Sequence, residues 1–231
     1  VNHEAEESYL QLTPVAAQKG ILYAHPAGTL NAQLQPFWNA TDACCDFFKS
    51  QVDDVAYLSG LIDEIKGRYA VDPKRVFLVG HSNGGFMAHR MACERADLVT
   101  GIVSLAGATF ADPGACQPGA PVSVVQVHGT SDETVLYGGG LFFGVSYPGA
   151  VTTASRWAAL DGCTLGATTA ATLDLDAALP GSETAVRRAG PACAAQSAVE
   201  LWTIQGGVHS PAVSGTLAGA AVDFLLAHPR P

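Results

Sequence analysis

Charged side chains are scarce in this chain of 231 residues. Asp, Glu, Lys and Arg make up only 14% of it, and 21 acidic against 12 basic residues give a formal net charge of −9. Such a surface gains little from a phosphate backbone or from anionic lipid. We therefore expect no nucleic-acid partner and no membrane partner.

Long apolar runs are missing as well. The best stretches, 101–106 and 122–127, fall far short of the roughly 18 to 20 residues that a membrane-spanning helix needs. The sequence therefore predicts no transmembrane segment. The chain is long enough for one α/β domain with a substantial core and short for two, so we predict a single catalytic domain over 1–231.

Metal-binding patterns are absent too. None of the six cysteines belongs to a CxxC motif or stands at zinc-ligand spacing from a histidine, so we expect neither metal nor cofactor. An even number of cysteines with few lysines favours disulfides and an oxidising compartment over buried free thiols. Cys163 ends a predicted helix and Cys193 precedes a predicted strand, so we pair these two. The other four would form two bridges whose pairing stays open: Cys44, Cys45, Cys93 and Cys116.

What the sequence does contain is an alternation of strand-like and helix-like segments. Five short apolar runs closed by Gly or Pro predict buried parallel strands: 20–26, 75–80, 101–107, 122–129 and 199–207. Helical spacing predicts helices over 52–69, behind Ser50 as the N-cap, and over 84–97, 150–163 and 215–228. This order indicates a doubly wound, mostly parallel α/β fold. We interpret the Gly- and Pro-rich stretches 108–120 and 133–150 as site-forming loops.

The segment 76–90, VFLVGHSNGGFMAHR, places one serine on a bend between a predicted strand and a predicted helix. Its GxSxG core is the pattern of a nucleophile elbow, in which the turn forces Ser82 into a strained backbone conformation. We expect Gly80 and Gly84 to avoid clashes across the turn, and Gly85 to let the helix pack close to the sheet. The backbone N–H of Asn83 would face a developing oxyanion. The alternative for Ser82 is an ordinary turn serine.

A serine hydroxyl needs a base, and that base needs an orienting acid. Asp132 and His209 each follow a predicted parallel strand, so with Ser82 they stand in the chain order of a Ser-Asp-His triad. Turn or surface roles are the alternatives. Only Asp132 directly follows a parallel strand, unlike four competing aspartates: Asp112, Asp161, Asp174 and Asp176.

The other histidines are weaker candidates. We expect His81 and His128 to shape the site rather than react, and His25 to line the site or to be structural. The remaining three are expected on the solvated surface: His3, His89 and His228.

Two aromatic stretches are candidates for substrate contact. In FWNATDACCDF, Trp38 and Asn39 would form a pocket wall, with a plain core role for Trp38 as the alternative. In GGGLFFGVSYPG, Leu141, Phe142 and Phe143 would form an apolar contact surface, with core packing as the alternative.

Several motifs together resemble a known group of secreted esterases: FWNATDACCDF, VDDVAYLSGLIDEI, VDPKRVFLVGHSNGGFMAHRMACERAD, VQVHGTSDETV and ELWTIQGGVHS. The group includes LpqC-type proteins, polyhydroxybutyrate depolymerases and feruloyl or acetylxylan esterases, and the similarity runs over most of 8–228. It implies an α/β-hydrolase fold with Ser82 as nucleophile, Asp132 as acid, His209 as base and Asn83 as oxyanion donor. It also implies extracellular action on ester-bearing polymers or their fragments.

The sequence departs from this group in two respects. HSPAVSG follows the predicted catalytic histidine where the group often has an aromatic residue, which would leave the acyl site more open. The group also has an N-terminal strand, placed between 21–25 and 75–80, whose His-Gly loop supplies a second oxyanion N–H. This chain starts after that point, without a signal peptide and with Val rather than Met. We expect a processed or trimmed chain that lacks upstream residues, and a continuous sheet built from Val1 onward would contradict this.

These observations predict a secreted, monomeric serine ester hydrolase that forms an acyl-enzyme. Few charges and an apolar loop favour polyesters as substrates, such as a polyhydroxyalkanoate or poly(ethylene terephthalate), or their oligomers. The alternative is a feruloyl or acetylxylan esterase acting on plant cell-wall polysaccharide. A serine peptidase and a non-catalytic carbohydrate-binding protein are the less favoured alternatives.

Overall fold

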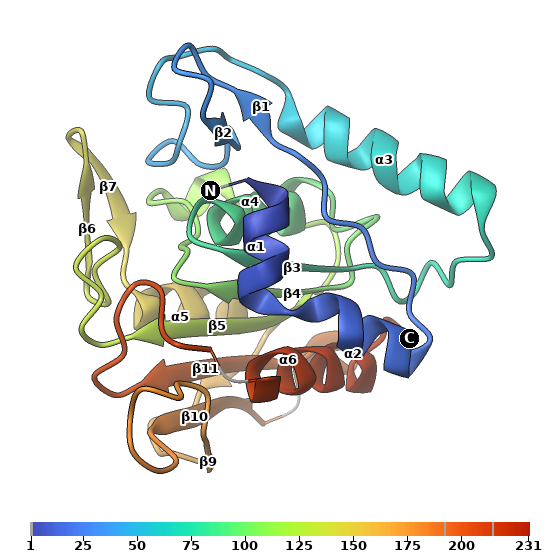
Figure 1. Cartoon of the computed structure of the whole chain (residues 1–231). Helices are drawn as coiled ribbons and strands as arrows, with labels where there is room; N and C mark the ends of the chain where they lie inside the picture. Colours follow the sequence, from blue (N-terminus) through green and yellow to red (C-terminus); the bar gives the residue numbers. More distant parts are fainter. Residues whose placement is uncertain (1, 192, 214) are drawn as a thin grey trace.

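The structure, a computed structural model, describes residues 2–191, 193–213 and 215–231. In its central sheet four strands run parallel: β3 (Phe77–His81), β4 (Gly101–Leu105), β5 (Ser123–Gly129) and β11 (Val199–Ile204). An antiparallel strand, β10 (Thr184–Gly190), lies beside β11 and pairs with the short β8 (Thr164–Leu165) and β9 (Ala171–Leu173). The order β3-β4-β5-β11-β10-β8 confirms the predicted mostly parallel α/β fold (Figure 1).

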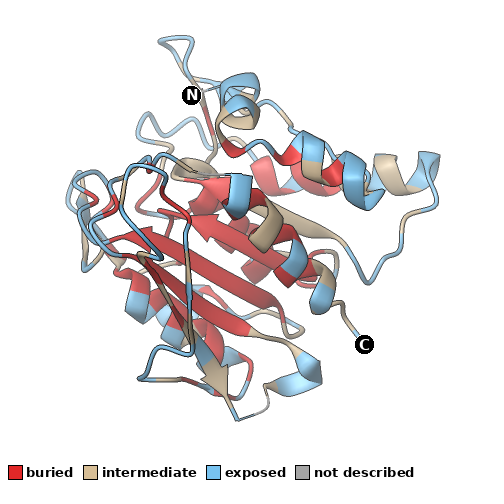
Figure 2. Ribbon diagram, turned by 60° about the horizontal axis from the view of Figure 1, so that its bottom comes forward, coloured by how far each residue is buried: buried red, intermediate tan, exposed pale blue. Residues whose placement is uncertain are grey.

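Helices cover both faces of this sheet. The first face carries α3 (Asp54–Arg68), α4 (Asn83–Glu94) and α5 (Ala150–Leu160), and the second carries α1 (His3–Leu10), α2 (Leu12–Lys19) and α6 (Gly215–Ala227). Because side chains alternate along a strand, Ile102 packs into the first apolar cluster and its neighbour Val103 into the second. The central strands are accordingly the most buried part of the molecule (Figure 2). No helix in the described ranges is long and apolar enough to cross a bilayer.

All four predicted helices form, but the predicted N-cap of α3 is wrong. Asp53 caps this helix, since its carboxylate accepts a hydrogen bond of 2.9 Å from the Ala56 N–H. Ser50 instead donates its N–H and its hydroxyl to the carboxylate of Asp46. An aspartate next to the helix is as good a cap as serine, so the sequence alone did not separate them.

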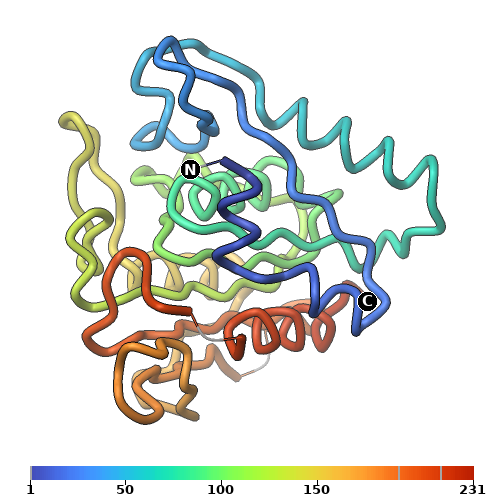
Figure 3. The backbone as a smooth tube through the Cα atoms, viewed as in Figure 1, coloured from blue at the N-terminus to red at the C-terminus, as the bar shows by residue number. Residues whose placement is uncertain are grey.

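The predicted strand over 20–26 is also wrong. Residues 21–28 run without regular structure from α2 to β1 (Thr29–Leu30), which forms a small hairpin with β2 (Pro36–Phe37) (Figure 3). The side chains of this segment are mostly exposed, and among the described strands none pairs with it. An apolar run becomes a strand only when a partner takes its backbone hydrogen bonds. The sheet starts at β3, so the expectation that upstream residues complete it stays a prediction.

Part of the stretch 133–150 is a hairpin rather than a loop. It consists of β6 (Gly139–Phe142) and β7 (Val145–Pro148), joined by Phe143 and Gly144 with φ values of 49° and 86°. Positive φ at both turn residues is typical of tight hairpins, because it matches the twist of the strands. The turn leaves Phe143 exposed at the tip.

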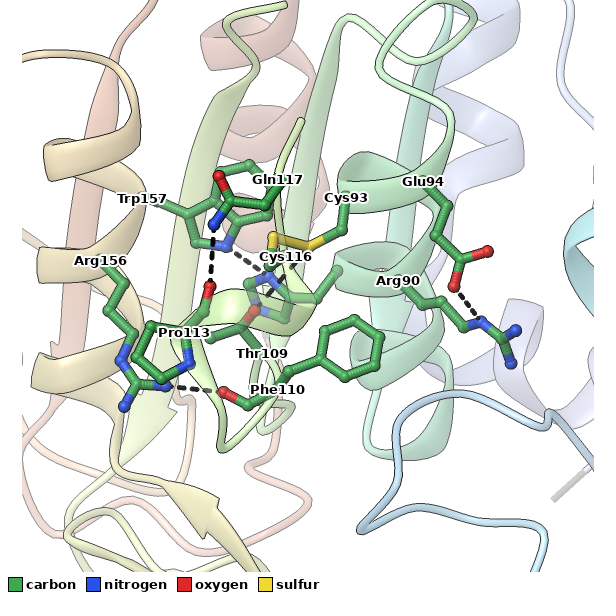
Figure 4. Close-up of a disulfide and its surroundings, with 11 residues drawn as sticks. Arg90, Cys93, Glu94, Thr109, Phe110, Pro113, Cys116, Gln117, Arg156 and Trp157 are labelled. Atoms are coloured by element: carbon green, nitrogen blue, oxygen red, sulfur yellow. Dashed lines mark hydrogen bonds and ion pairs between the residues drawn. A yellow bond between two sulfur atoms is a disulfide. The ribbon is translucent and has the colours of Figure 1, made fainter. Parts of the chain in front are cut away.

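Three disulfides join all six cysteines. Cys163 pairs with Cys193, which confirms the prediction. The open pairing of the other four is now resolved: Cys93 bonds to Cys116, and Cys44 bonds to its neighbour Cys45. The Cys93–Cys116 bridge ties α4 to the connection between β4 and β5, beside Trp157 (Figure 4).

Candidate active site

Ser82 stands on the bend between β3 and α4. Its φ of 54° and ψ of −120° lie outside the regions that a serine normally occupies, which confirms the strained turn predicted from GxSxG. The Ser82 N–H donates to the Leu105 carbonyl at 2.8 Å, and its own carbonyl accepts from the Phe86 N–H at 3.0 Å. Hydrogen bonds on both sides therefore hold the strained residue in place.

The glycines around Ser82 differ in the space that a side chain would find at each position. A Cβ at Gly80 would lie 2.2 Å from the Gly84 carbonyl oxygen, so this position excludes any side chain. A Cβ at Gly85 would lie 2.7 Å from the Ser104 Oγ, as expected where a helix packs closely on a sheet. A Cβ at Gly84 would meet nothing within 4 Å. Steric need therefore explains Gly80 and Gly85, while the expected need at Gly84 is wrong.

The structure brings Ser82, His209 and Asp132 together. The Ser82 hydroxyl donates to His209 Nε2 at 2.9 Å, and His209 Nδ1 donates to Asp132 Oδ2 at 2.9 Å. The loops that carry Asp132 and His209 follow adjacent parallel strands and touch, since the Ser131 N–H donates to the Gly207 carbonyl at 2.9 Å. Three side chains that are far apart in the sequence thus form one continuous hydrogen-bonded relay.

The carboxylate of Asp132 is fully buried and receives donors on both oxygens. Oδ1 accepts from the N–H groups of Thr134 and Val135, each at 2.8 Å. Oδ2 accepts from His209 and lies 3.2 Å from His128 Nε2. Burial alone would raise the pKa of Asp132, but the donors from His128, His209 and the two N–H groups hold that pKa well below its ordinary value. Asp132 is therefore ionised wherever the protein is folded near neutral pH.

Asn83 begins α4, so its backbone N–H has no partner within the helix and lies beside Ser82. Its side chain has a role that the sequence did not reveal. Asn83 Oδ1 accepts from the Trp38 N–H at 2.7 Å, and Asn83 Nδ2 donates to the Trp38 carbonyl at 2.9 Å. This paired contact fixes the segment containing Trp38 against the elbow.

His81 connects the elbow to the loop of His209. Its Nε2 donates to the His209 carbonyl at 2.9 Å, and its Nδ1 lies 2.9 Å from a carboxylate oxygen of Glu6 on α1. His81 therefore touches the backbone that carries the candidate base and not the Ser82 hydroxyl. This placement fits the predicted shaping role.

One histidine prediction is wrong. His89 is completely buried in α4 rather than solvated, and burial lowers its pKa to about 4. Its partners, Gln126 and Trp157, come from β5 and α5, so no local signal in the sequence marked it as a core residue. His3 contacts the exposed His25 at 2.9 Å between their Nδ1 atoms.

A cavity of about 690 Å³ lies beside the candidate site. Its wall includes Ser82 and His209 and continues along β3, between α3 and the segment 21–26. Trp38 also lines the cavity, as predicted. His25 lines it too, which favours the site-lining role over a purely structural one. The side chain of Asn39 instead donates to the Val52 carbonyl at 2.9 Å and is not among the described lining residues.

The aromatic residues of the β6–β7 hairpin meet the loop after Cys45. The Phe47 ring lies 4.9 Å from that of Phe143 and 6.2 Å from that of Phe142, and we call these three residues the aromatic cluster. Phe142 is half-buried and also packs 6.3 Å from Phe86 of α4, whereas Phe143 is 86% exposed. Of the two alternatives for this stretch, core packing therefore applies to Phe142 and an exposed apolar surface to Phe143.

The parallel sheet, the elbow and the side chains gathered at the carboxyl ends of its strands define the class of protein, an α/β hydrolase. A family model described as Phospholipase/Carboxylesterase matches residues 26–142, and the chain belongs to this family. In the described residues no group of three or more potential metal ligands is present.

Known proteins agree with this assignment. The chain is 32% identical over 166 residues to feruloyl esterase B of Piromyces equi, a match that covers 68% of this chain and 30% of that protein. It is 32% identical over 84 residues to a bifunctional acetylxylan esterase/xylanase of Neocallimastix patriciarum, covering 36% of this chain and 12% of that protein. The matched region thus spans less than a third of either relative. A variant of Arabidopsis thaliana SOBER1 shares the fold, with a TM-score of 0.61 at 13% identity over 99% of this chain and 94% of that one.

Proposed function

We propose that this protein is a carboxylic ester hydrolase that works through a Ser82–His209–Asp132 triad and an acyl-enzyme. The observation that carries the proposal is the relay of two 2.9 Å hydrogen bonds that ends on a serine with a φ of 54°. A buried, ionised carboxylate behind the imidazole and a hydroxyl in front of it are the arrangement that activates a serine. All three residues belong to one chain, so a monomer suffices.

In the first step His209 takes the proton of Ser82 as Oγ bonds to the ester carbonyl carbon. Asp132 stabilises the imidazolium, and the Asn83 N–H stabilises the oxyanion. His209 then gives the proton to the leaving alcohol as the carbon–oxygen bond breaks. Water, activated by the same imidazole, finally releases the acid from Ser82.

Labelling with a fluorophosphonate tests the assignment directly. We expect stoichiometric labelling of the wild type at Ser82, no labelling of Ser82→Ala, and a loss of about 10⁴-fold or more in p-nitrophenyl ester turnover for that variant. Ser210→Ala is a matched control, because this neighbouring serine lies outside the relay. Near wild-type turnover by Ser82→Ala would refute the triad. A wild type without labelling would favour a non-catalytic binding protein, and turnover of peptides over esters would favour a peptidase.

For the substrate we favour aromatic or acetyl esters of plant polysaccharides. The family relatives support this choice, since one is a feruloyl esterase and another an acetylxylan esterase/xylanase. The exposed Phe143 supplies a flat apolar surface on which an aromatic acid or a polymer segment would lie. Three disulfides support action in an oxidising, extracellular compartment.

A polyester is the second candidate substrate, and the exposed apolar end of the β6–β7 hairpin is the observation in its favour. Leu141 and Phe143 at the hairpin tip are 66% and 86% exposed, so they offer apolar contact area to a solid polymer without any loss of core packing. A polyhydroxyalkanoate or poly(ethylene terephthalate) surface would use this area, whereas a small acetyl ester would not.

Replacing the tip residue separates the two candidates. We expect Phe143→Ser to fold with unchanged Tm because the ring is exposed, and to keep its turnover of p-nitrophenyl acetate. We then compare the turnover of polyester films and of methyl ferulate. For the substrate that contacts the tip, the turnover rate of the variant should fall about fivefold or more. Val145→Ser is the control on the same hairpin, at 37% exposure. Equal rates of wild type and Phe143→Ser on every substrate would remove the hairpin from the proposal.

A further inference from the structure

One of the four donors to Asp132 comes from neither the triad nor the surrounding backbone. His128 Nε2 lies 3.2 Å from Asp132 Oδ2 and 2.7 Å from the carbonyl oxygen of Val135. Both neighbours only accept hydrogen bonds, so Nε2 must carry the hydrogen, which bonds to the Val135 carbonyl and also faces the Asp132 carboxylate. The side chain of His128 is 1% exposed, and that of Asp132 is fully buried. Bulk water therefore does not reach this contact between His128 and Asp132.

The other nitrogen of His128 faces Gln126, two residues earlier on β5. Gln126 Nε2 donates to the Gly107 carbonyl at 2.9 Å and lies 3.3 Å from His128 Nδ1. The alternative orientation of the amide would set its oxygen against the Gly107 oxygen, which excludes it. The amide N–H thus points at His128 Nδ1, which must be unprotonated to accept it.

The same amide is held from its other side by two further buried residues. Gln126 Oε1 accepts from His89 Nε2 at 2.9 Å, and His89 Nδ1 accepts from the indole N–H of Trp157 at 2.9 Å. Trp157 and Gln126 are completely buried, as is His89. An indole N–H only donates, so the direction of every hydrogen bond from Trp157 to Asp132 is determined. The chain Trp157–His89–Gln126–His128, which we call the buried chain, has no second arrangement of its hydrogens.

This direction matters for the charge on Asp132. A second proton on His128 Nδ1 would point at the Gln126 amide hydrogen, so the buried chain keeps His128 neutral. A cationic His128 would compensate the Asp132 charge and compete with His209 for it. A neutral His128 orients the carboxylate and leaves its full charge to the imidazolium that forms on His209.

From this geometry we propose that His128 is a positioning residue for Asp132, held in one neutral tautomer by Gln126, His89 and Trp157. The inference rests on the proposed triad, because it needs Asp132 to act on His209. The titratable groups that face His128 are Asp132, Tyr137, whose ring lies 5.7 Å from the imidazole, and His89 through Gln126. Burial lowers the pKa of His89 to about 4, so that ring is neutral at the working pH.

Variants at position 128 test the donor. His128→Phe keeps the ring shape and removes the N–H that faces the Asp132 carboxylate, so we expect kcat to fall about 10- to 100-fold while KM stays within about twofold. His128→Gln places an amide nitrogen the same number of bonds from the backbone as Nε2, and we expect it to restore at least about tenfold of the loss. Tyr137→Phe is the control, since it removes a hydrogen bond to Thr203 beside the same ring without touching His128 nitrogen atoms.

A variant at position 126 tests the control of protonation. Gln126→Leu leaves His128 Nδ1 free to take a proton. A cationic His128 would weaken the hold of Asp132 on the His209 imidazolium, so the acid limb of the kcat/KM profile should move to lower pH. A role confined to folding would lower Tm without moving the profile. Tyr137→Phe should reproduce the wild-type profile.

The ¹⁵N chemical shifts of His128 and His89 in the wild type give a readout that needs no variant. We expect both rings to be neutral with hydrogen on Nε2 from pH 6 to pH 8. A cationic ring or an Nδ1–H tautomer at His128 would overturn the proposal, as would full kcat in a folded His128→Phe. If Ser82→Ala also keeps its activity, the triad itself fails; if only His128→Phe is active, the triad stands and this inference alone is wrong.

Discussion

Gly80 and Gly84 stand at equal distances from Ser82 in the sequence, yet their surroundings differ. A side chain at Gly80 would collide with backbone atoms of Gly84, whereas a side chain at Gly84 meets open space. The motif therefore contains one glycine needed for packing and one that packing does not require. Only the folded turn distinguishes them, because the contact is between residues whose relative placement depends on the strained φ of Ser82.

We expect Gly80→Ala to destabilise the fold by about 1–3 kcal/mol and to displace Ser82, with a loss of most activity, because backbone atoms at 2.2 Å cannot move away as a side chain would. Gly84→Ala should leave Tm unchanged or raise stability by up to about 1 kcal/mol, since alanine favours a helix. Urea unfolding and ester turnover of the two variants measure this contrast. Equal destabilisation by both would contradict it.

At this scale the convergence of Ser82, Asp132 and His209 was predictable, because each follows a strand and their chain order matches the pattern of the motif. The residues around them were not. The second contact of Asp132, from His128, and the paired contact of Asn83 with Trp38 join parts of the chain that no local pattern relates. His89 was misjudged for the same reason, since its partners lie on two other elements.

At the scale of elements, periodicity predicted every parallel strand of the sheet and four helices. It failed for β10, in which the half-buried Arg187 and the exposed Arg188 interrupt the apolar pattern. It also placed a strand over 20–26, which has apolar residues but no described partner. Strand formation depends on a neighbour that takes the backbone hydrogen bonds. Two helices were missed as well, α1 and α2, which are short and lie against α6.

The C-terminal end of α5 carries an unusual carboxyl group. Asp161 is the C-cap of this helix and is completely buried, and burial raises its pKa to about 6, an effect that Ser197 and the Val122 N–H partly offset. A helix C-terminus also disfavours negative charge. Because the folded-state pKa lies above the ordinary value of 3.8, the contribution of Asp161 to stability is full below about pH 4 and is lost as pH rises through about 6.

We expect Asp161→Asn to raise the free energy of unfolding at pH 7.5, by at most about 3 kcal/mol, and to have little effect at pH 4. Urea titrations of wild type and variant at the two pH values measure the difference. Asp97→Asn is a control of opposite sign, because the ion pair with Arg95 lowers the pKa of Asp97. An Asp161→Asn variant that is less stable than wild type at pH 7.5 would contradict the assignment.

At the scale of the whole molecule, two of the disulfides join elements that are separate in the chain. Cys163–Cys193 spans 30 positions and Cys93–Cys116 spans 23, whereas Cys44–Cys45 joins neighbours. In the chain-entropy account, a bridge stabilises the fold by restricting the unfolded chain, and the effect grows with the loop it closes. The three bridges should therefore contribute very unequally.

We expect the double variant Cys163→Ser with Cys193→Ser to lose about 3–4 kcal/mol of unfolding free energy. The matched double variant Cys44→Ser with Cys45→Ser should lose less, because it opens no loop of appreciable length. Guanidinium unfolding at constant temperature compares the two. A larger loss for the neighbouring pair would show that local structure, and not loop closure, determines their effect.

In the described part of the chain, the outer edge of β3 has unpaired backbone groups, which affects how the protein behaves in solution. Among the described residues no strand covers it, and the cavity of about 690 Å³ lies along it. Uncovered strand backbone recruits further chains, so this polypeptide produced by itself should self-associate as its concentration rises. Light scattering over a dilution series would measure this association, and we expect the apparent mass to rise with concentration.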